Sequence, residues 1–217
     1  MDSDLDLATV DRLLSTTRAV RKRLDLTRPV PDAVIEDALR LAVQAPSAAD
    51  EQNWRWLVVT DPEVRKVIAD VHRAGNEPFL RSALEDLGPG GERRRLESAL
   101  YLVEHLHEVP ALVLAYVLTP DLPGLGERAL PPGLLYGSIW PAAWSFQLAL
   151  RARGLGTTPV YVTDAEAVAA IVAAPANAEL TTLMPVAYYT GDTFKPAPRR
   201  PLDEVVHWNI WPASTPG

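Results

Sequence analysis

Two short segments near the start of the sequence carry side chains that could bind a flat ligand bearing a phosphate group. Residues 17–21 contain Arg18 and Arg21, which follow a predicted helix at the point where the chain turns extended. Residues 45–54 are small at first and then polar, and they lead directly into a predicted strand. Guanidinium groups form forked hydrogen bonds to phosphate, and small residues let a planar ring approach the backbone. Together the two segments suggest a binding site for a phosphorylated heteroaromatic ligand.

The polar end of the second segment adds hydrogen-bonding groups suited to the edge of a ring. Asp50, Gln52 and Asn53 can exchange hydrogen bonds with ring heteroatoms. From the far end of the chain, Arg199 or Arg200 could complete a phosphate clamp. Each feature also has a simpler interpretation, because exposed arginines are common and helix-to-strand connections are often polar. These residues by themselves leave both interpretations open.

Composition limits the other classes of function. The net charge is −7 without a basic stripe, so we expect no nucleic-acid partner. The absence of cysteine excludes disulfides, thiolate metal sites and a cysteine nucleophile. His105 and His107 are two residues apart and would point to different faces of a helix, so we expect no metal site. An enzyme or a binding protein is the remaining expectation.

Nothing in the hydrophobic pattern predicts membrane insertion. Residues 133–150 are mostly apolar and close to spanning length, but they include Ser138, Pro141 and Gln147. A helix buried inside a globular core fits this composition better. The first four residues include two aspartates and lead into no apolar signal core, so we expect a cytoplasmic protein.

Apolar periodicity predicts helices and strands in irregular alternation, which favours one α+β domain. The predicted helices cover residues 7–16 and 31–45, a stretch that begins at Asp61, the region around 96–106, residues 141–153, and a stretch after Thr163 with Glu166 completing a capping box. The predicted strands cover residues 54–60, 110–118, 158–162 and 182–190. Gly154 is expected in a left-handed conformation at the end of the helix over 141–153.

We expect residues 1–217 to form a single domain with two special regions. Residues 72–135 are interpreted as a variable lid or insert, because 75–91 are rich in loop-forming residues. Residues 195–217 form a proline-rich tail that ends in an apolar segment with Trp208 and Trp211. Such a tail could wrap around a partner subunit and pack on its sheet edge, or it could fold back on its own domain.

Five blocks in the right order make the sequence resemble the FMN-dependent nitroreductase family over residues 13–208. They are 17–21 (Thr-Arg-Ala-Val-Arg), 45–47 (Ala-Pro-Ser) with Gln52 and Trp54, 137–142 (Gly-Ser-Ile-Trp-Pro-Ala), 148–156 (Leu-Ala-Leu-Arg-Ala-Arg-Gly-Leu-Gly) and 199–206 (Arg-Arg-Pro-Leu-Asp-Glu-Val-Val). The resemblance implies an α-β-α sandwich with a mostly antiparallel central sheet. It also implies an intertwined homodimer with two FMN sites at the subunit interface.

The same resemblance assigns roles to individual residues. Arg18, Ala19 and Arg21 would hold the phosphate and ribityl chain of FMN, and Arg200 or its neighbour Arg199 would close the phosphate site. The remaining contacts would come from three places: Asp50 and Gln52 at the pyrimidine edge, Ser138 and Ile139 from the partner subunit, and residues 157–161, including Thr157 and Thr158, along the ring near N5.

Two positions differ from the family pattern. Thr17 replaces the first basic residue of the arginine block, which removes one phosphate donor. Asp50 stands where the family usually has asparagine, so this side chain can accept from the flavin N3–H but cannot donate to a ring carbonyl. Its charge would also oppose the anionic reduced ring. We therefore expect a flavin that is harder to reduce, or more weakly bound, than in other members.

The activity implied by the resemblance is an FMN-dependent oxidoreductase that takes hydride from NAD(P)H. Flavin N5 would carry out the chemistry and pass the hydride to nitroaromatic, quinone or similar electron-poor acceptors, so no catalytic protein residue is assigned. One alternative is a flavin-dependent dehydrogenase or oxidase of a specialised metabolite. Another is a flavin-binding member of the family without reductase turnover.

Overall fold

The centre of the molecule is a four-stranded antiparallel sheet in the order β1-β2-β4-β3. A computed structural model describes residues 5–119 and 132–211. The strands are β1 (Trp54–Val59), β2 (Ala111–Leu118), β3 (Leu155–Gly156) and β4 (Ala178–Tyr188). Side chains of β2 alternate between two apolar clusters, with Leu112 in one and Val113 in the other. The apolar run predicted as a strand buried on both faces is thus confirmed.

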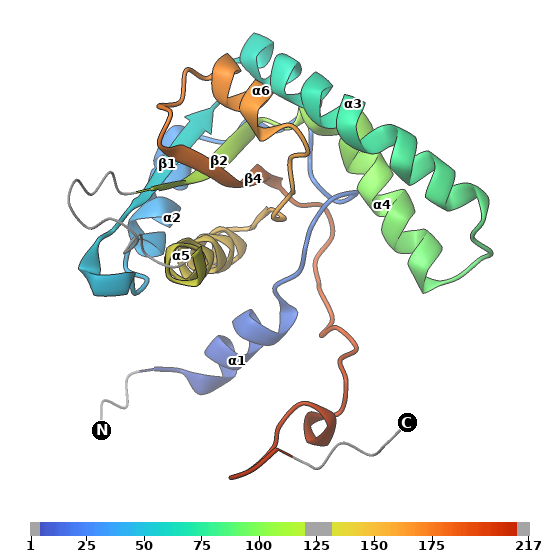
Figure 1. The fold of residues 1–217 in the computed structure, drawn as a ribbon. Helices are drawn as coiled ribbons and strands as arrows, with labels where there is room; N and C mark the ends of the chain where they lie inside the picture. Colours follow the sequence, from blue (N-terminus) through green and yellow to red (C-terminus); the bar gives the residue numbers. More distant parts are fainter. Residues whose placement is uncertain (1–4, 120–131, 212–217) are drawn as a thin grey trace.

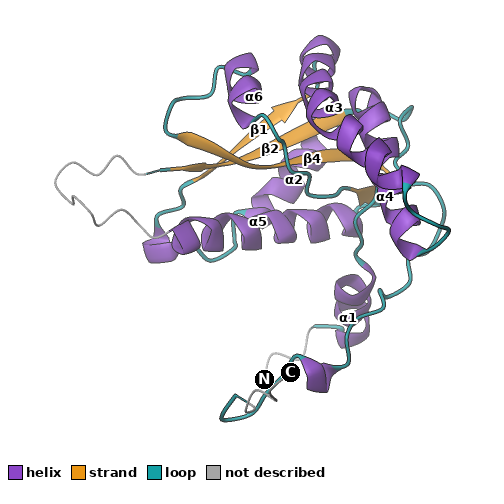
Figure 2. Ribbon diagram, turned by 45° about the vertical axis from the view of Figure 1, so that its right-hand side comes forward, coloured by secondary structure: helices purple, strands orange, loops and turns teal. Residues whose placement is uncertain are grey.

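Helices cover both faces of this sheet (Figure 1, Figure 2). One face carries α2 (Asp32–Ala42) and α5 (Pro132–Ala152), and the other carries α3 (Pro62–Glu85), α4 (Gly91–His105) and α6 (Ala165–Ile171). The predicted α-β-α sandwich with an antiparallel sheet is confirmed. No helix within 5–119 and 132–211 combines the length and apolarity that crossing a membrane requires.

The loop predicted over 75–91 is wrong, because α3 continues as a helix to Glu85. Gly75 is a packing glycine and not a helix breaker. A Cβ built there would lie 1.8 Å from Thr163 Oγ1, so only glycine lets the helix pass the turn before α6. A connection of five residues, 86–90, leads into α4. Within the predicted lid region, Ala111–Leu118 form the central strand β2, and residues 120–131 lie outside the described residues.

The helix predicted over 141–153 begins nine residues earlier, at Pro132, and includes Pro141 in its interior. A proline removes one backbone hydrogen bond, but burial on both sides of it outweighs that loss. Ile139 and Ala142 are fully buried here, and Phe146 one turn later is buried as well. The helix ends where expected, since Gly154 adopts the left-handed φ of 78°.

The predictions around β3 and β4 are partly wrong. Residues 158–162 form no strand, and Val160 makes only an isolated bridge to Leu183. β4 begins at Ala178 and not at residue 182. Helix α6 is capped by Asp164, whose side chain accepts from Ala167 N, and not by the predicted pair at 163 and 166. Propensity alone could not distinguish neighbouring acceptors at this turn.

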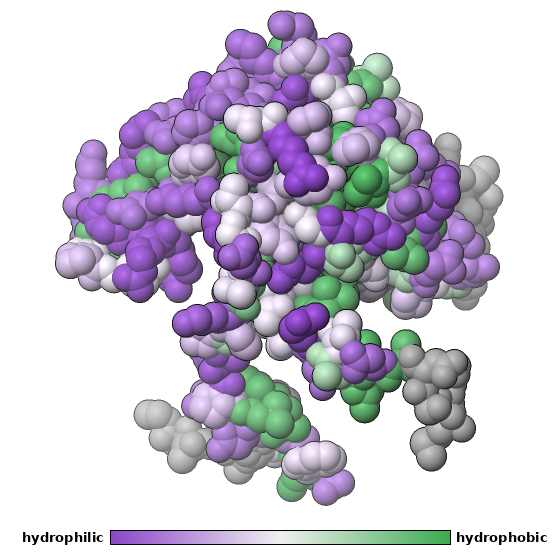
Figure 3. Space-filling model, turned by 180° about the vertical axis from the view of Figure 1, so that it is seen from behind, coloured by the Kyte–Doolittle hydropathy of each residue, from purple (hydrophilic) through white to green (hydrophobic). Residues whose placement is uncertain are grey.

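Two segments leave the body on the same side, and we call them the arms: α1 (Leu7–Thr16) and residues 195–211 of the tail (Figure 1). Helix α1 has the predicted bounds but buries none of its residues. The tail from 201 to 211 is exposed throughout, and Trp208 and Trp211 are 83% and 79% exposed. Figure 3 shows hydrophobic side chains on these arms. The tail therefore does not fold back on its own domain; residues 212–217 lie outside the described residues.

Candidate functional site

The arginine segment is held in an extended form between α5 and the turn after β3. It begins at Thr17, the residue that caps α1, whose hydroxyl donates to Leu13 O at 2.6 Å. Next, the Arg18 carbonyl accepts from Gln147 Nε2 of α5 at 3.1 Å. Two residues later, Val20 N donates to Thr157 O at 3.0 Å. These contacts fix the backbone from which the predicted phosphate-binding side chains project.

Glycine allows that close contact. A Cβ built on Gly156 would lie 2.8 Å from Val20 Cβ, so no side chain fits between the arginine segment and β3. The glycine in the 148–156 block thus brings residues 18–21 next to residues 157–158, which are far apart in the sequence. The structure joins two of the predicted parts of the site.

The side chains of Arg18 and Arg21 carry charge without a partner. Both are half-buried, and no carboxylate of the described residues lies within 4.0 Å of either guanidinium. Burial lowers the pKa of the Arg21 guanidinium from its usual value, as expected for a cation that loses water and gains no anion. An anionic group bound here would restore the lost stabilisation. Ala19 between them is exposed.

The predicted ring-edge loop has a strained backbone. Ala49, Asp50 and Gln52 have φ angles of 52°, 55° and 47°, in the left-handed region that non-glycine residues seldom occupy. Strain of this kind persists only where neighbouring contacts hold it, and it is often found at functional sites. Ser47 Oγ provides one such contact by accepting from Gln52 N at 3.2 Å.

The two polar residues predicted at the pyrimidine edge lie side by side. Gln52 Nε2 donates to Asp50 Oδ1 at 2.9 Å, and both side chains are exposed. The carboxylate therefore keeps its other oxygen free to accept. The amide oxygen of Gln52 makes no hydrogen bond with any described residue. The loop therefore offers hydrogen-bond acceptors on an open surface. The Asp50 carboxylate provides no donor, unlike an asparagine at the same position.

Ser138 and Ile139 are buried within the chain itself. Ser138 Oγ accepts from Ala48 N at 3.0 Å and donates to Leu134 O at 3.0 Å, which attaches the loop to α5. Ile139 is fully enclosed and packs with Trp54. Their predicted contact with a ligand across a subunit interface stays a prediction. Within one chain, both residues position the loop.

A buried hydroxyl without a partner lies beside the arginine segment. Thr157 and Thr158 are each 1% exposed. Thr158 Oγ1 donates to Pro159 O at 3.3 Å, whereas Thr157 Oγ1 makes no hydrogen bond within the described part of the chain. An unpaired buried hydroxyl costs stability and usually has a partner in the functional state. Its position next to Val20 fits a ligand that runs along the arginine segment.

The predicted closure by Arg199 and Arg200 is not formed within one chain. Both residues are exposed on the tail arm, which runs away from the sheet beside α1 (Figure 2). Arg199 Nη1 donates only to the adjacent Pro198 O among the described residues. These arginines could reach a phosphate only if the tail packs differently or on another subunit, so their role stays a prediction.

Sequence reasoning missed the part played by Gln147. This side chain is 5% exposed, and among the described residues its one hydrogen-bond partner is the Arg18 carbonyl. A polar residue inside the otherwise apolar stretch 133–150 was a usable signal, because buried amides are kept where they have a specific partner. It was read only as evidence against a membrane span.

Comparison with known proteins now fixes the family. The sequence matches the Nitroreductase family over residues 14–188. The chain belongs to this family. The match spans every strand of the sheet and both body segments of the candidate site, and it ends before the tail.

Relatives within the family carry out different reactions. The chain is 28% identical to an NADH dehydrogenase of Thermus thermophilus, over 90% of this chain and 97% of that protein. It is 33% identical to a 5,6-dimethylbenzimidazole synthase of Rhodospirillum rubrum, over 77% and 76%. The crystal structure of an oxidized iodotyrosine deiodinase bound to FMN and 3-iodo-L-tyrosine superposes with a TM-score of 0.69 at 25% identity, covering 90% of this chain and 96% of the other.

Proposed function

We propose that this protein is an FMN-dependent oxidoreductase. The observation that carries the proposal is the pair of half-buried guanidiniums, Arg18 and Arg21, without carboxylate partners beside the unpaired hydroxyl of Thr157. A ligand with a phosphate ester and a polar ring would give the guanidiniums an anion and the Thr157 hydroxyl a hydrogen-bond partner. The FMN in the related deiodinase structure supports this choice of ligand.

Bound FMN would supply hydride transfer from NAD(P)H, through N5, to an electron-poor acceptor such as a nitroaromatic or a quinone. The protein's part is to bind and orient. Arg18 and Arg21 would hold the phosphate, Thr157 Oγ1 would donate to the ligand, and Asp50 would accept from the N3–H of the ring. Gln147 would keep the arginine backbone in place through its bond to the Arg18 carbonyl.

Asp50 should make the flavin harder to reduce than an asparagine would. Its carboxylate lies on the open loop, where the Gln52 amide donates to one oxygen and no cation of the described residues lies within 4.0 Å. A negative charge near a ring that becomes anionic opposes reduction. We expect the Asp50→Asn variant to have a more positive reduction potential or to bind FMN more tightly. An unchanged potential together with unchanged affinity would rule this role out.

The arms support assembly as a homodimer. In the sheet order, β1 has an open edge, and the tail offers the exposed apolar segment 205–211. We place this segment on the β1 edge of a second copy, where main-chain hydrogen bonds and the tryptophans would both find partners. The same exchange would let Arg199 or Arg200 approach a phosphate held by the other chain, and Ser138 and Ile139 would lie near the interface.

Two regional roles and a location complete the proposal. The α3–α4 hairpin is the described part of 72–135 that could cover a substrate, and residues 195–217 would wrap the partner around a single domain of 1–217. The exposed Phe79 on α3 suits a lid surface. A chain of 217 residues without cysteine suits the cytoplasm.

A second candidate function is a dehydrogenase or oxidase of a specialised metabolite. The relatives favour it, because an NADH dehydrogenase, a deiodinase and a benzimidazole synthase share this fold with different substrates. A third candidate is flavin binding without turnover, which the departures at Thr17 and Asp50 favour.

An absorbance experiment separates these candidates. Purified protein is scanned for flavin absorbance, then mixed anaerobically with NADPH or NADH, and finally given a quinone. Bleaching followed by quinone-dependent recovery of the absorbance is the expected result. Bleaching by another substrate alone would support the second candidate, and flavin absorbance without bleaching would support the third. Colourless protein that FMN cannot reconstitute would overturn the proposal.

A further inference from the structure

Helix α1 contributes polar side chains to a space between itself and its own domain. Thr9, Arg12 and Thr16 follow each other at spacings of three and four residues and line this space together with the half-buried Leu13. Leu7 and Leu14 are exposed and remain for the proposed dimer contact. The three polar side chains make the space suitable for a polar ligand.

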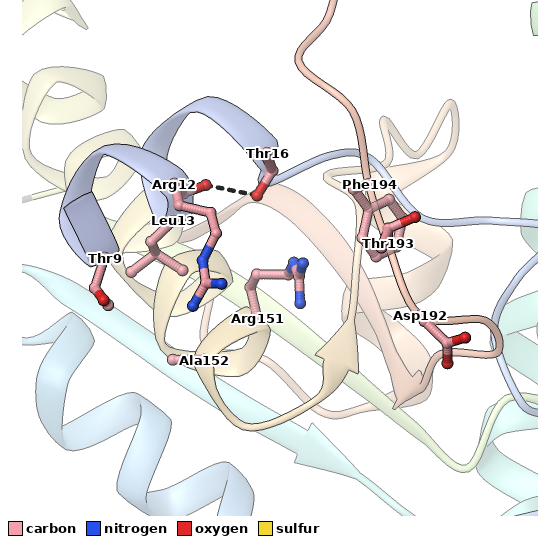
Figure 4. Close-up of a pocket in the computed structure, with 9 residues that line it drawn as sticks. All are labelled: Thr9, Arg12, Leu13, Thr16, Arg151, Ala152, Asp192, Thr193 and Phe194. Carbon is pink, nitrogen blue, oxygen red and sulfur yellow. Dashed lines mark hydrogen bonds between the residues drawn. The ribbon is translucent and has the colours of Figure 1, made fainter.

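That space is a cavity of about 430 Å³, a volume typical of small-molecule sites. Three segments enclose it: α1, the end of α5, and the chain just after β4. Figure 4 shows guanidinium groups entering it from two of these segments, Arg12 from α1 and Arg151 from α5. Leu13, Ala152 and Phe194 supply apolar wall.

Arg151 is held rigidly with part of its hydrogen-bonding capacity unused. Its guanidinium carbon lies 4.9 Å from the ring centre of Tyr189 and 4.8 Å from that of Phe194. Nη1 donates to the Tyr189 hydroxyl, whereas Nε is buried and has no acceptor among the described residues. Nη2 makes no hydrogen bond to a described residue, so it remains to donate to an oxyanion. The contacts with Tyr189 and Phe194 already orient this side chain.

The cavity has an uncompensated positive charge. Neither Arg12 nor Arg151 has a carboxylate of the described residues within 4.0 Å. Asp192 also lines the cavity, yet it pairs with neither arginine. With two guanidiniums and one carboxylate, the lining keeps a net positive charge, and a bound oxyanion between the two guanidiniums would offset their repulsion.

We propose that this cavity binds a small molecule carrying a carboxylate or phosphate group, bridged between Arg12 and Arg151. The Thr9 and Thr16 hydroxyls lie on the same wall, and the apolar wall would accept a compact hydrocarbon part of the ligand. None of the residues predicted to bind FMN lines the cavity, so this is a separate site. Because α1 buries no residue, such a ligand would tie α1 to the body.

The test is titration calorimetry on the full chain after incubation with excess FMN and removal of the unbound part. The probes are pyrophosphate and succinate in chloride buffer at constant ionic strength. Saturable binding of either probe is expected, and it should weaken about tenfold or more in Arg12→Gln and in Arg151→Gln, since a charged hydrogen bond contributes that much. The matched control is Arg95→Gln, an exposed arginine on α4 that should leave binding unchanged.

Each other outcome overturns the site. Equal weakening by Arg95→Gln, or no saturation, means general attraction of anions only. Displacement of flavin by the probes, or weaker FMN binding in Arg12→Gln, means that the cavity belongs to the cofactor site. A change from dimer to monomer in Arg12→Gln during sedimentation means that a second copy fills it. If Arg151→Gln does not fold, Arg12→Gln decides alone, because Arg12 lies on an exposed helix.

Discussion

The body of this protein buries its large apolar side chains, whereas the arms expose theirs. In the body, strand β2 is buried on both faces, and helices of both layers supply two large apolar clusters. In the arms, Leu7 of α1 is 71% exposed, and the two tail tryptophans are still more exposed. Exposed groups of large apolar side chains usually mark a surface that contacts another molecule.

This difference separates what stabilises the fold from what completes the function. The body fixes the backbone of Arg18 and Val20 by contacts that a single chain provides. The arms hold the exposed arginines at 199 and 200 and the apolar segment 205–211, which we assign to a second chain. One part of the candidate site, the arginine segment, is thus formed within a single chain. The other part would form only when the arms of a second chain bind.

Removing a core side chain of the body should have the largest effect. Phe146 is fully buried in α5 and packs its ring 5.7 Å from that of Trp56. We expect Phe146→Ala to lower the free energy of unfolding by about 3–5 kcal/mol, because it deletes a large apolar group and leaves a cavity. Urea denaturation measures this. A loss below about 1 kcal/mol would mean that the body is packed no better than the arms.

Acid should weaken the body through His72. This side chain is 3% exposed on α3, and burial lowers its pKa to about 4. The unfolded chain, with a pKa near 6.5, takes up the proton first. Stability is therefore full above about pH 6.5 and falls between pH 6.5 and 4, by up to about 3 kcal/mol. His72→Gln should flatten that part of a stability-against-pH curve, and an unchanged slope would contradict the assignment.

A methyl group at Gly75 should have a moderate effect. It would clash with Thr163 Oγ1, and overpacking costs about 1–3 kcal/mol, while the better helix propensity of alanine returns up to about 1 kcal/mol. We expect Gly75→Ala to destabilise the body by about 1–2 kcal/mol in urea denaturation. Adding Thr163→Ala should recover part of the loss. If Gly75→Ala alone proved more stable than the wild type, the turn before α6 would be able to move away at little energetic cost.

The smallest effect on stability should come from the arm. We expect Trp208→Ser with Trp211→Ser to change the sedimentation coefficient from dimer to monomer and to abolish the concentration dependence of the melting temperature. Extrapolated to low protein concentration, stability should change by less than about 0.5 kcal/mol, as for an exposed site. A large loss at every concentration would show that the tail packs on its own body.

Several parts of the fold could be read directly from the sequence. The bounds of α1, the buried strand β2 and the left-handed Gly154 each follow from local pattern: helical periodicity, a continuous apolar run, and a glycine after a helix. Asp50 and Gln52 are two residues apart in one loop, and their side chains are hydrogen-bonded to each other. The FMN contacts of these residues stay predictions.

Other parts could not be read in this way because they depend on distant contacts. Gly75 suggests a loop in the sequence, but it lies in a helix. A glycine is needed there because Thr163, far along the chain, packs against it. Pro141 suggests the start of a helix in the sequence, but it lies inside α5, whose packing against the sheet stabilises the helix on both sides of the proline. The use of Gln147 as a clamp for the Arg18 carbonyl needs the folded geometry as well. Local propensity is weaker than the burial that tertiary contacts provide.

The sequence by itself determined the family, the layered fold class and the residue types that suit a phosphate and a ring, since these depend on composition, periodicity and ordered blocks. Only the tertiary structure decided which charges lack partners. Arg18 and Arg21 flank Val20, whose backbone bonds to Thr157, and Arg12 and Arg151 line one cavity. Arg199 bonds only to the adjacent Pro198 among the described residues. Arginines look alike in a sequence, and only the folded surroundings of each unpaired guanidinium show which role it could have.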